Sequence, residues 1–312
     1  MSSQIPSSPL LQDIKISAIL PTYNRGRTIA RAVQSILDQS LAPLEIIVVD
    51  DGSTDDTRAR LGALDNAAVR YVHQPNAGAS AARNRGVNEA IGDWIAFLDS
   101  DDIWVPTHLQ RIATAITKTE GKASFYFADM ERPVELGGGS HWDHVGFSAK
   151  DEHEFTNDAS EWVALSWQPM MLQTSVFNRS KYLECGGLMN SIKVRHDNHI
   201  FLNLGLAGPA CAVPGYGTRQ TYDGGSADHL AAVSGSHTPD FWNDTVLLYT
   251  DILQRKTNLQ KRHRDIFRNR LALAYWRLSR FAWRDKMALP FFRNFLRCFL
   301  ADPAFLAGLT KP

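Results

Sequence analysis

The chain has 312 residues, of which 44% are hydrophobic and 21% charged, and its 33 Lys and Arg balance 33 Asp and Glu. This composition is typical of a folded protein with one large α/β domain and an appendage or with two ordinary domains, and it excludes a chain that is disordered throughout. The three cysteines include no C-x-x-C pair, which argues against a cysteine zinc site or a disulfide framework.

The sequence shows no secretory signal and no uncharged apolar run of about 18 residues, the length that a membrane span needs. We therefore expect a cytoplasmic protein in a reducing compartment. Residues 1–12, rich in Ser and Pro, are expected to form a flexible leader.

Strand and helix signals alternate over the first 130 residues. Short apolar runs predict strands at 14–20, 44–49, 69–73, 94–98 and 123–128. Amphipathic spacing predicts helices at 28–39, 54–64, 80–91 and 107–118. Strands joined by helices of this length favour right-handed βαβ units, so the predicted fold is α/β, with a mainly parallel central sheet flanked by helices.

The rest of the chain is less regular. Residues 131–160 are predicted to be a mobile loop with room for an edge strand, 173–177 a strand and 198–207 a helix. The predicted organisation is a nucleotide-binding domain at 13–222, a flexible loop at 223–240 and a helical region at 241–312. We expect breaks in that helical region at Pro290 and Pro303.

Polar residues follow three of the predicted strands where each strand ends, at 22–24, 50–53 and 99–102. In parallel sheets, ligands bind beyond the carboxyl ends of the strands. The three polar segments are therefore expected to meet at one ligand site.

The acidic turn at 99–102 is the strongest of these signals. Asp99 and Asp101 are separated by Ser100, and oxygen ligands of this kind suit Mg²⁺ or Mn²⁺, with a diphosphate supplying further oxygens. The alternative is an acidic turn that caps the helix after Pro106.

The second cluster, at 50–55, contains Asp51, whose carboxylate can accept hydrogen bonds from a nucleotide base or from ribose hydroxyls. Helix capping is the alternative for Ser53, Thr54 and Asp55, which suit that position well.

The third cluster, at 76–86, combines small residues with arginines at a helix start, a position that favours anions. Arg83 is predicted to reach a phosphate or a base, whereas Arg85 points elsewhere. The alternative for each arginine is a surface ion pair with an acidic residue.

Taken in order, the runs I-L-P-T-Y-N-R, V-V-D-D-G-S-T-D-D-T, N-A-G-A-S-A-A-R-N-R-G and W-I-A-F-L-D-S-D-D-I-W-V-P resemble the family 2 inverting glycosyltransferases of the GT-A fold. The motifs cover about 16–106, and a weaker likeness continues to about 222. The resemblance implies a GT-A-type nucleotide-binding domain.

The resemblance also implies roles for single residues. It gives nucleotide-binding roles to Pro21, Thr22, Tyr23, Asn24, Asp51, Arg83, Asp99 and Ser100. Asp99 and Asp101 correspond to the D-x-D pair, and Asp101 is the expected direct metal ligand.

The catalytic base of the family lies in an E-D-x-x-L-x-x-R-L-like segment, which 195–204 resembles here. Asp197 takes the position of the base, while His196 replaces the usual Glu and Asn203 the usual Arg. The alternative for Asp197 is helix N-capping. His196 and His199 are not interpreted as zinc ligands.

The implied reaction moves a sugar from a nucleoside-diphosphate sugar, with UDP as the default nucleotide, to a hydroxyl of a carbohydrate or lipid-linked acceptor. It would need Mn²⁺ or Mg²⁺ and would invert the anomeric carbon, as in cell-surface polysaccharide or glycoconjugate synthesis. A non-catalytic nucleotide-sugar-binding or assembly protein is the alternative from another class, and a nucleotidyltransferase is a second enzymatic one. Release of a nucleoside diphosphate rather than pyrophosphate separates the two enzymes.

The segment 255–297 carries 13 Lys and Arg but only two acidic residues, Asp265 and Asp285. Basic amphipathic helices with aromatic residues can bind an anionic membrane surface, so a peripheral contact through 255–299 at the inner face of the membrane is one interpretation. A helical appendage packed on the protein is the other. Nucleic acid is not expected as a partner, because no recognisable module supports it.

Overall fold

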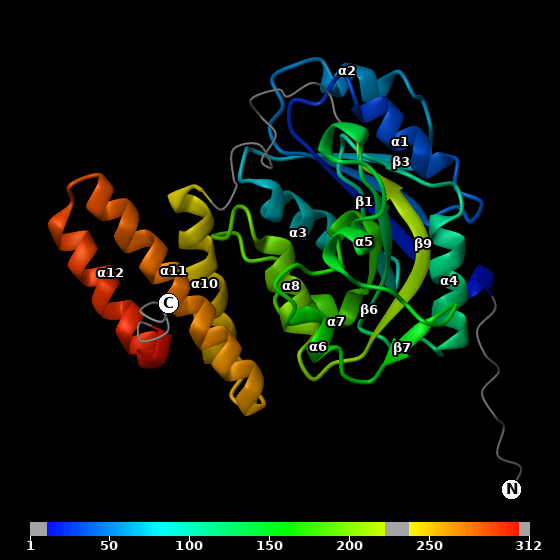
Figure 1. The fold of residues 1–312 in the computed structure, drawn as a ribbon. Helices are drawn as coiled ribbons and strands as arrows, with labels where there is room; N and C mark the ends of the chain where they lie inside the picture. Colours follow the sequence, from blue (N-terminus) through cyan, green and yellow to red (C-terminus); the bar gives the residue numbers. More distant parts are fainter. Residues whose placement is uncertain (1–10, 222–236, 306–312) are drawn as a thin grey trace, which may run out of the picture. The chain divides into compact units, whose positions relative to one another are not determined.

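The computed structural model describes residues 11–221 and 237–305 (Figure 1). Most of the predicted leader and most of the predicted loop at 223–240 lie outside these residues. Contacts divide the chain into two compact units, Met1–Leu188 with Leu204–Asp223, and Met189–Asn203 with Gly224–Pro312. Each unit is described by itself.

Within the described residues, nine strands of the first unit form one sheet, in the order β3-β2-β1-β4-β8-β6-β9-β5, with β7 paired to β9. The strands are β1 (Ile16–Thr22), β2 (Glu45–Asp50), β3 (Val69–His73), β4 (Trp94–Phe97), β5 (Ile103–Trp104), β6 (Phe125–Glu131), β7 (Glu154–Thr156), β8 (Ser175–Asn178) and β9 (Ala210–Arg219).

Helices connect these strands. They are α1 (Ile29–Leu37), α2 (Thr57–Gly62), α3 (Ala79–Glu89), α4 (His108–Lys118), α5 (His141–Val145), α6 (Ser160–Val163) and α7 (Arg179–Glu184), with short 3-10 turns η1 (Leu11–Asp13), η2 (Val134–Leu136) and η3 (Leu172–Thr174). Every strand and helix predicted over the first 130 residues is therefore confirmed, with shifts of a few residues at some ends.

The sheet is parallel through β3, β2, β1 and β4, as βαβ connections require. Beyond β4 it is mixed, which corrects the expectation of a mainly parallel sheet for this half. The reason is β8, which enters the sheet between β4 and β6 and runs antiparallel to both.

The strand β9 has no counterpart in the sequence prediction. Pro214, Gly215 and Gly217 interrupt its apolar pattern, and Gly215 has a φ of 92°. The pairing of β9 with β6 shifts register on either side of Asp129, so the strand continues past these residues as an irregular one.

The segment 131–160, predicted to be a mobile loop, contains η2, α5 and the edge strand β7. The buried carboxylate of Asp129 orders its first part, because it accepts the backbone N–H of Trp142 and the hydroxyl of Ser140 at 3.0 and 2.6 Å. The edge strand β7 agrees with the prediction, and the residues between η2, α5 and β7 are irregular.

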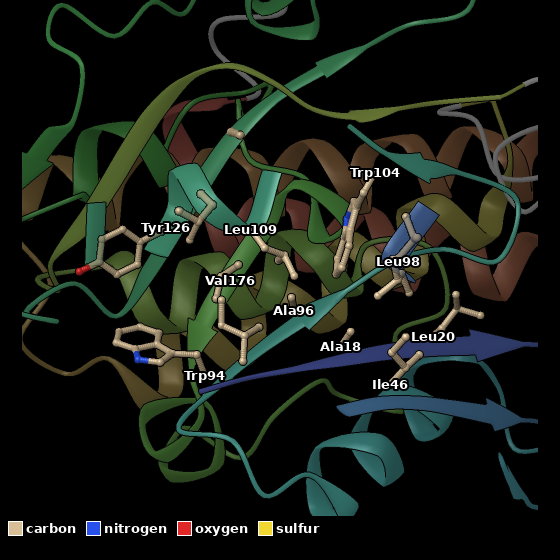
Figure 2. Packing of buried hydrophobic residues seen from close by; sticks show 14 of the residues in the cluster. Ala18, Leu20, Ile46, Trp94, Ala96, Leu98, Trp104, Leu109, Tyr126 and Val176 are labelled. Atoms are coloured by element: carbon tan, nitrogen blue, oxygen red, sulfur yellow. The ribbon is translucent and has the colours of Figure 1, made fainter. Parts of the chain in front are cut away.

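The core of the first unit follows from the alternation of side chains along the strands. Alternate residues of β1 and β4, such as Leu20 and Ala96, pack in one cluster with the apolar faces of α1 and α4 (Figure 2). The opposite face receives Ile19 and Phe97, and α3 packs there against β1 and β2. The sheet is thus buried on both faces, and its polar groups remain at the strand ends.

The second unit contains α8 (His196–Gly205) up to Asn203, with α10 (Pro239–Arg255), α11 (Lys261–Arg284) and α12 (Ala288–Ala301). The expected C-terminal helical region is confirmed. The break between α10 and α11 at 256–260 was not predicted. The chain does not break at Pro290, which lies in the first turn of α12, where proline is tolerated. Among the described residues, no helix is long and apolar enough to cross a membrane.

The segment 189–203 groups with the C-terminal helices, although the sequence places it in the domain 13–222. The physical reason is a set of hydrogen bonds from this segment to α10, which includes two backbone amides bound by Asp244.

Candidate functional site

The ends of β1 and β2 are joined by hydrogen bonds. The backbone N–H of Asn24 donates to the Ser53 hydroxyl at 2.9 Å, and the Asn24 side-chain oxygen accepts the backbone N–H of Thr54 at 2.8 Å. Asn24 has a left-handed φ of 51°, which asparagine tolerates better than most residues. Two of the three polar segments therefore meet, as the sequence predicts.

Asp51 is 3% exposed and joins the end of β2 to the start of α3. One carboxylate oxygen accepts from the Gln74 side chain at 2.7 Å and from the backbone N–H of Ala77 at 2.9 Å. The other accepts the backbone N–H of Gly78 at 2.8 Å. Its visible role is to hold the loop 74–78, and a contact with a nucleotide stays a prediction.

Helix capping was the alternative role for Asp55, and its carboxylate does accept a hydrogen bond from the start of a helix. Its two oxygens accept the backbone N–H groups of Thr57, in the first turn of α2, and of Gly26, both at 3.0 Å. Asp50, at the last position of β2, accepts the Tyr71 hydroxyl at 2.6 Å. Burial, with the neighbouring Asp50 carboxylate, raises the pKa of Tyr71 to about 12.

Arg83 lies on α3, is only 5% exposed, and forms an ion pair with Asp99 at the end of β4. The alternative of a surface ion pair does not apply to Arg83, since the arginine is buried. It does apply to Arg85, whose half-exposed side chain pairs with Glu89 one turn further on.

Asp101 follows in the same turn and pairs with Arg25, whose Nε lies 3.6 Å from Oδ2 of Asp101. The backbone carbonyl of Asp101 accepts hydrogen bonds from Arg31 at 3.1 Å and from the Thr221 hydroxyl. The third polar segment is thereby attached to the end of β1 and to the residues after β9.

Asp102 is buried, and its carboxylate accepts from the backbone N–H of Thr221 at 3.1 Å and the Gln173 side chain at 3.3 Å. Burial, followed by repulsion from Asp99 and Asp101, raises the pKa of Asp102 well above its usual range. Asp99 and Asp102 thus bond side chains and loops rather than the first turn of α4, which was the capping alternative.

Several residues of this site were missed by sequence reasoning. They are Arg25, Arg31, Gln173 and Thr221. Arg25 stands at the end of the first motif and offered a signal. Thr221 offered none, because it is 120 positions from the carbonyl that it bonds.

The remaining predicted residues line the end of β1 and the acidic turn. Pro21, Thr22 and Ser100 are buried, whereas the ring of Tyr23 is 43% exposed. Among the described residues, the buried hydroxyl oxygen of Thr22 has no hydrogen-bond partner. A buried polar atom without a partner is costly, so this one marks a place where a ligand group would be stabilised.

The donor atoms of the acidic turn fit a cation held jointly with phosphate. Asp99 and Asp101 keep side-chain exposures of 31% and 20%, and their negative charge adds to burial in raising the pKa of Asp102. Within the part of the chain that the structure describes, no three His, Cys, Asp or Glu side chains form a complete metal cage. Mg²⁺ is commonly bound by one or two carboxylates with substrate phosphates, which this arrangement matches.

Asp197 belongs to the second unit and lies in the first turn of α8. Its Oδ1 accepts the backbone N–H of Asn198 at 2.7 Å. It is therefore one residue inside the helix rather than at the N-cap, and it remains partly exposed. His196 bonds the carbonyl of Lys193 through Nδ1 at 3.1 Å.

Known sequences match the part of the chain that carries the strand-end site. The family described as Glycosyl transferase family 2 matches residues 17–164. The UDP-Glc:alpha-D-GlcNAc-diphosphoundecaprenol beta-1,3-glucosyltransferase WfgD of Escherichia coli is 35% identical over 122 residues, 39% of this chain and 47% of that protein. The succinoglycan biosynthesis protein ExoW of Rhizobium meliloti is 31% identical over 153 residues, 47% of this chain and 46% of that protein. The matches thus cover less than half of the length of either curated relative.

Solved structures match more of the chain. The crystal structures of S. aureus TarS 1-349 with UDP and with UDP-GlcNAc have TM-scores of 0.60 and 0.59, at 17% and 18% identity. Each covers 94% of this chain and 92% of the solved one. At this identity the likeness shows a shared fold. Residues 17–164, from β1 to α6, therefore match glycosyltransferase family 2, and the fold of the chain is of the GT-A type.

Proposed function

We propose that the protein is an inverting glycosyltransferase that moves a sugar from a nucleoside-diphosphate sugar, with UDP as the default nucleotide, to an acceptor hydroxyl. The observation that carries the proposal is the meeting of the three strand-end segments, joined by Asn24 with Ser53 and by Arg25 with Asp101, while Asp51 attaches the start of α3 through Gly78. The TarS complexes with UDP and UDP-GlcNAc and the UDP-Glc-dependent activity named for WfgD support a nucleotide-sugar donor. The names of WfgD and ExoW support a role in cell-surface polysaccharide or glycoconjugate synthesis, with a carbohydrate or lipid-linked acceptor.

In this proposal the loops after β1 and β2 bind the nucleoside. Pro21, Thr22, Tyr23 and Asn24 line the base, and the Thr22 hydroxyl gains the partner that it lacks. Arg83, held in place by Asp99, would neutralise a phosphate of the donor.

Asp101, with Asp99, would hold Mn²⁺ or Mg²⁺ together with the diphosphate, with Ser100 between them in the donor site. The bound cation would neutralise charge on the leaving nucleoside diphosphate. Arg25, which follows β1, orients the carboxylate of Asp101 in this turn.

Asp197 would act as the general base that removes the proton of the acceptor hydroxyl during attack on the anomeric carbon. A single base without a second nucleophilic carboxylate fits one displacement with inversion, by analogy with glycoside cleavage. The alternative, a non-catalytic nucleotide-sugar-binding or assembly protein, predicts instead that the donor binds without turnover.

The test is product release from a panel of nucleotide sugars with Mn²⁺ and candidate acceptors. We expect nucleoside diphosphate release that falls at least about 100-fold in Asp197→Asn, as for loss of a general base. In Asp101→Ala, Mn²⁺ should no longer strengthen nucleotide binding, while Glu135→Ala, an exposed acid on η2, should behave as wild type. Release of pyrophosphate, or donor binding without turnover by the wild type, would overturn the proposal.

A peripheral membrane contact also belongs to the proposed function, and we propose that it is made by α12. In α11 the apolar stripe is used internally, since Phe267, Ala274 and Ala282 are buried. On α12 one helical face instead exposes apolar residues at i, i+3, i+7, i+10 and i+11, namely Leu289, Phe292, Leu296, Phe299 and Leu300. Arg293 and Arg297 flank this stripe, which favours an anionic lipid surface over an apolar protein partner.

Vesicle flotation tests this contact. The protein should float with vesicles of phosphatidylglycerol but not of phosphatidylcholine, and high salt should weaken the binding. The double change Phe292→Glu and Leu296→Glu should abolish flotation, whereas Ile91→Glu, at an equally exposed apolar residue of the first unit, should not. A wild type that stays with the soluble fraction, or that forms dimers through α12, would exclude the membrane contact.

A further inference from the structure

The segment that carries Asp197 is fixed to α10 by buried polar side chains of the second unit. Asp244 on α10 is 5% exposed, and its Oδ2 accepts the backbone N–H groups of Lys193 and Val194 at 2.9 and 2.7 Å. One carboxylate thus holds the backbone three to four residues before Asp197.

Arg195 makes a second connection. Its guanidinium lies 5.1 Å from the ring centre of Phe241 and 5.8 Å from that of Tyr249, both on α10. It also donates to the Thr245 hydroxyl at 3.1 Å and to the Asn198 side chain at 3.0 Å. The side chain is therefore held between α10 and the first turn of α8.

His199 makes the third connection, two residues after Asp197. It is 2% exposed, and its Nε2 lies 2.8 Å from the Asp251 carboxylate of α10, which also pairs with Arg255. Burial lowers the pKa of His199, so the neutral ring donates Nε2–H to Asp251. The carbonyl of Asn203 accepts from Lys256 at 2.8 Å, at a position where the sequence departs from the family pattern.

We propose that α10 is a positioning element for the general base, with Asp244 and Asp251 as positioning residues. This inference rests on the proposed role of Asp197. Asp197 lies between two anchored points, Val194 and His199, and its own carboxylate is bonded to the backbone N–H of Asn198. Because a base displaced by about 1 Å loses much of its effect, anchors on both sides set the rate of the chemical step.

The first experiment compares two changes at Asp244 in the full-length protein. Asp244→Ala removes the acceptor of two amides and should lower kcat about tenfold, with the KM for the donor unchanged. Asp244→Asn keeps an acceptor oxygen and should recover most of the loss. Asn243→Ala, at the exposed neighbour on the same helix, is the matched control and should have no effect.

The second experiment separates positioning from general stability. Each change is repeated in the Asp197→Asn background, where positioning of the base no longer matters. There Asp244→Ala should change kcat by less than about twofold, since mutations that act through one group are not additive. Asp251→Ala serves as the second variant if thermal unfolding shows that Asp244→Ala does not fold.

An unchanged kcat in folded Asp244→Ala and Asp251→Ala would overturn the inference. So would a loss of kcat that is equal in the wild-type and Asp197→Asn backgrounds. These results differ from failure of the proposed function. That failure would appear as a wild type that releases no nucleoside diphosphate from any donor, or as an Asp197→Asn variant with full activity.

Discussion

His108, in the first turn of α4, is fully buried, and among the described residues neither of its ring nitrogens has a hydrogen-bond partner. Burial, with the charge of Arg111 adding to it, lowers the pKa of His108 to about 3. The unfolded chain binds a proton near pH 6.5, whereas the folded protein does not until about pH 3. The contribution of His108 to the free energy of unfolding is therefore constant above about pH 6.5 and becomes more unfavourable as the pH falls toward 3.

The change His108→Phe keeps an aromatic ring against Trp104, 5.2 Å away, and removes the titration. We expect the variant to gain stability relative to the wild type by about 1.4 kcal/mol per pH unit between pH 6 and 4. Urea unfolding at several pH values measures this difference. Parallel pH profiles for the two proteins would show that His108 already binds a proton in the folded state.

Asp51 offers a second prediction for a single residue, because its carboxylate accepts three hydrogen bonds while nearly fully buried. In Asp51→Asn, an amide group would face donors and leave at least one backbone N–H unpaired. We expect a loss of about 2 kcal/mol in the free energy of unfolding. Asp56→Asn, at an exposed acid five residues on, is the control and should change stability by less than about 0.5 kcal/mol.

Among the elements, α3 approaches the sheet most closely at Gly86. A Cβ atom at this position would lie 2.4 Å from Ile19 of β1 and 3.3 Å from Val49 of β2. The change Gly86→Ala should therefore destabilise the protein by about 1–3 kcal/mol, as overpacked cores do.

Gly62→Ala is the matched control, since a Cβ atom at the end of α2 would meet nothing within 4 Å. This change should stabilise the protein by about 0.4–1 kcal/mol through the unfolded chain. Thermal unfolding of both variants measures the contrast. Equal effects would mean that α3 can move away from β1 at little cost.

The elements also show where local patterns stop being informative. The strands β1 to β4 and their helices were predictable, because each has an apolar period that depends only on near neighbours in sequence. β9 was not predictable, since its Pro and Gly residues interrupt the alternation of apolar residues. Its pairing with β6 is set by residues about 85 positions away.

For the whole molecule, the arrangement of contacts predicts how far the chain can be shortened. The segment 189–203 packs in the second unit, and its amides at 193 and 194 are bonded to α10. A chain that ends at residue 236 should keep a folded first unit but lose hydrogen-exchange protection in 193–203.

A chain that ends at residue 286 is the control, because it lacks α12 but retains all of α10 and α11. Its protection in 193–203 should match that of the full chain. Hydrogen exchange read by mass spectrometry gives both results. Protection that survives loss of α10 would show that the segment is held by something other than the contacts described.

The sequence by itself determined the α/β fold, the order of the first strands and the polar groups at their ends, because each of these depends on short runs of neighbouring residues. Only the tertiary structure decided which groups are partners there: Arg83 with Asp99, Arg25 with Asp101, and Thr221 with Asp102. It alone also showed that α11 buries its apolar stripe while α12 exposes one, and that α10 holds the segment of Asp197. The physical reason is that burial and hydrogen bonding between distant residues depend on how elements pack, and no local period records that packing.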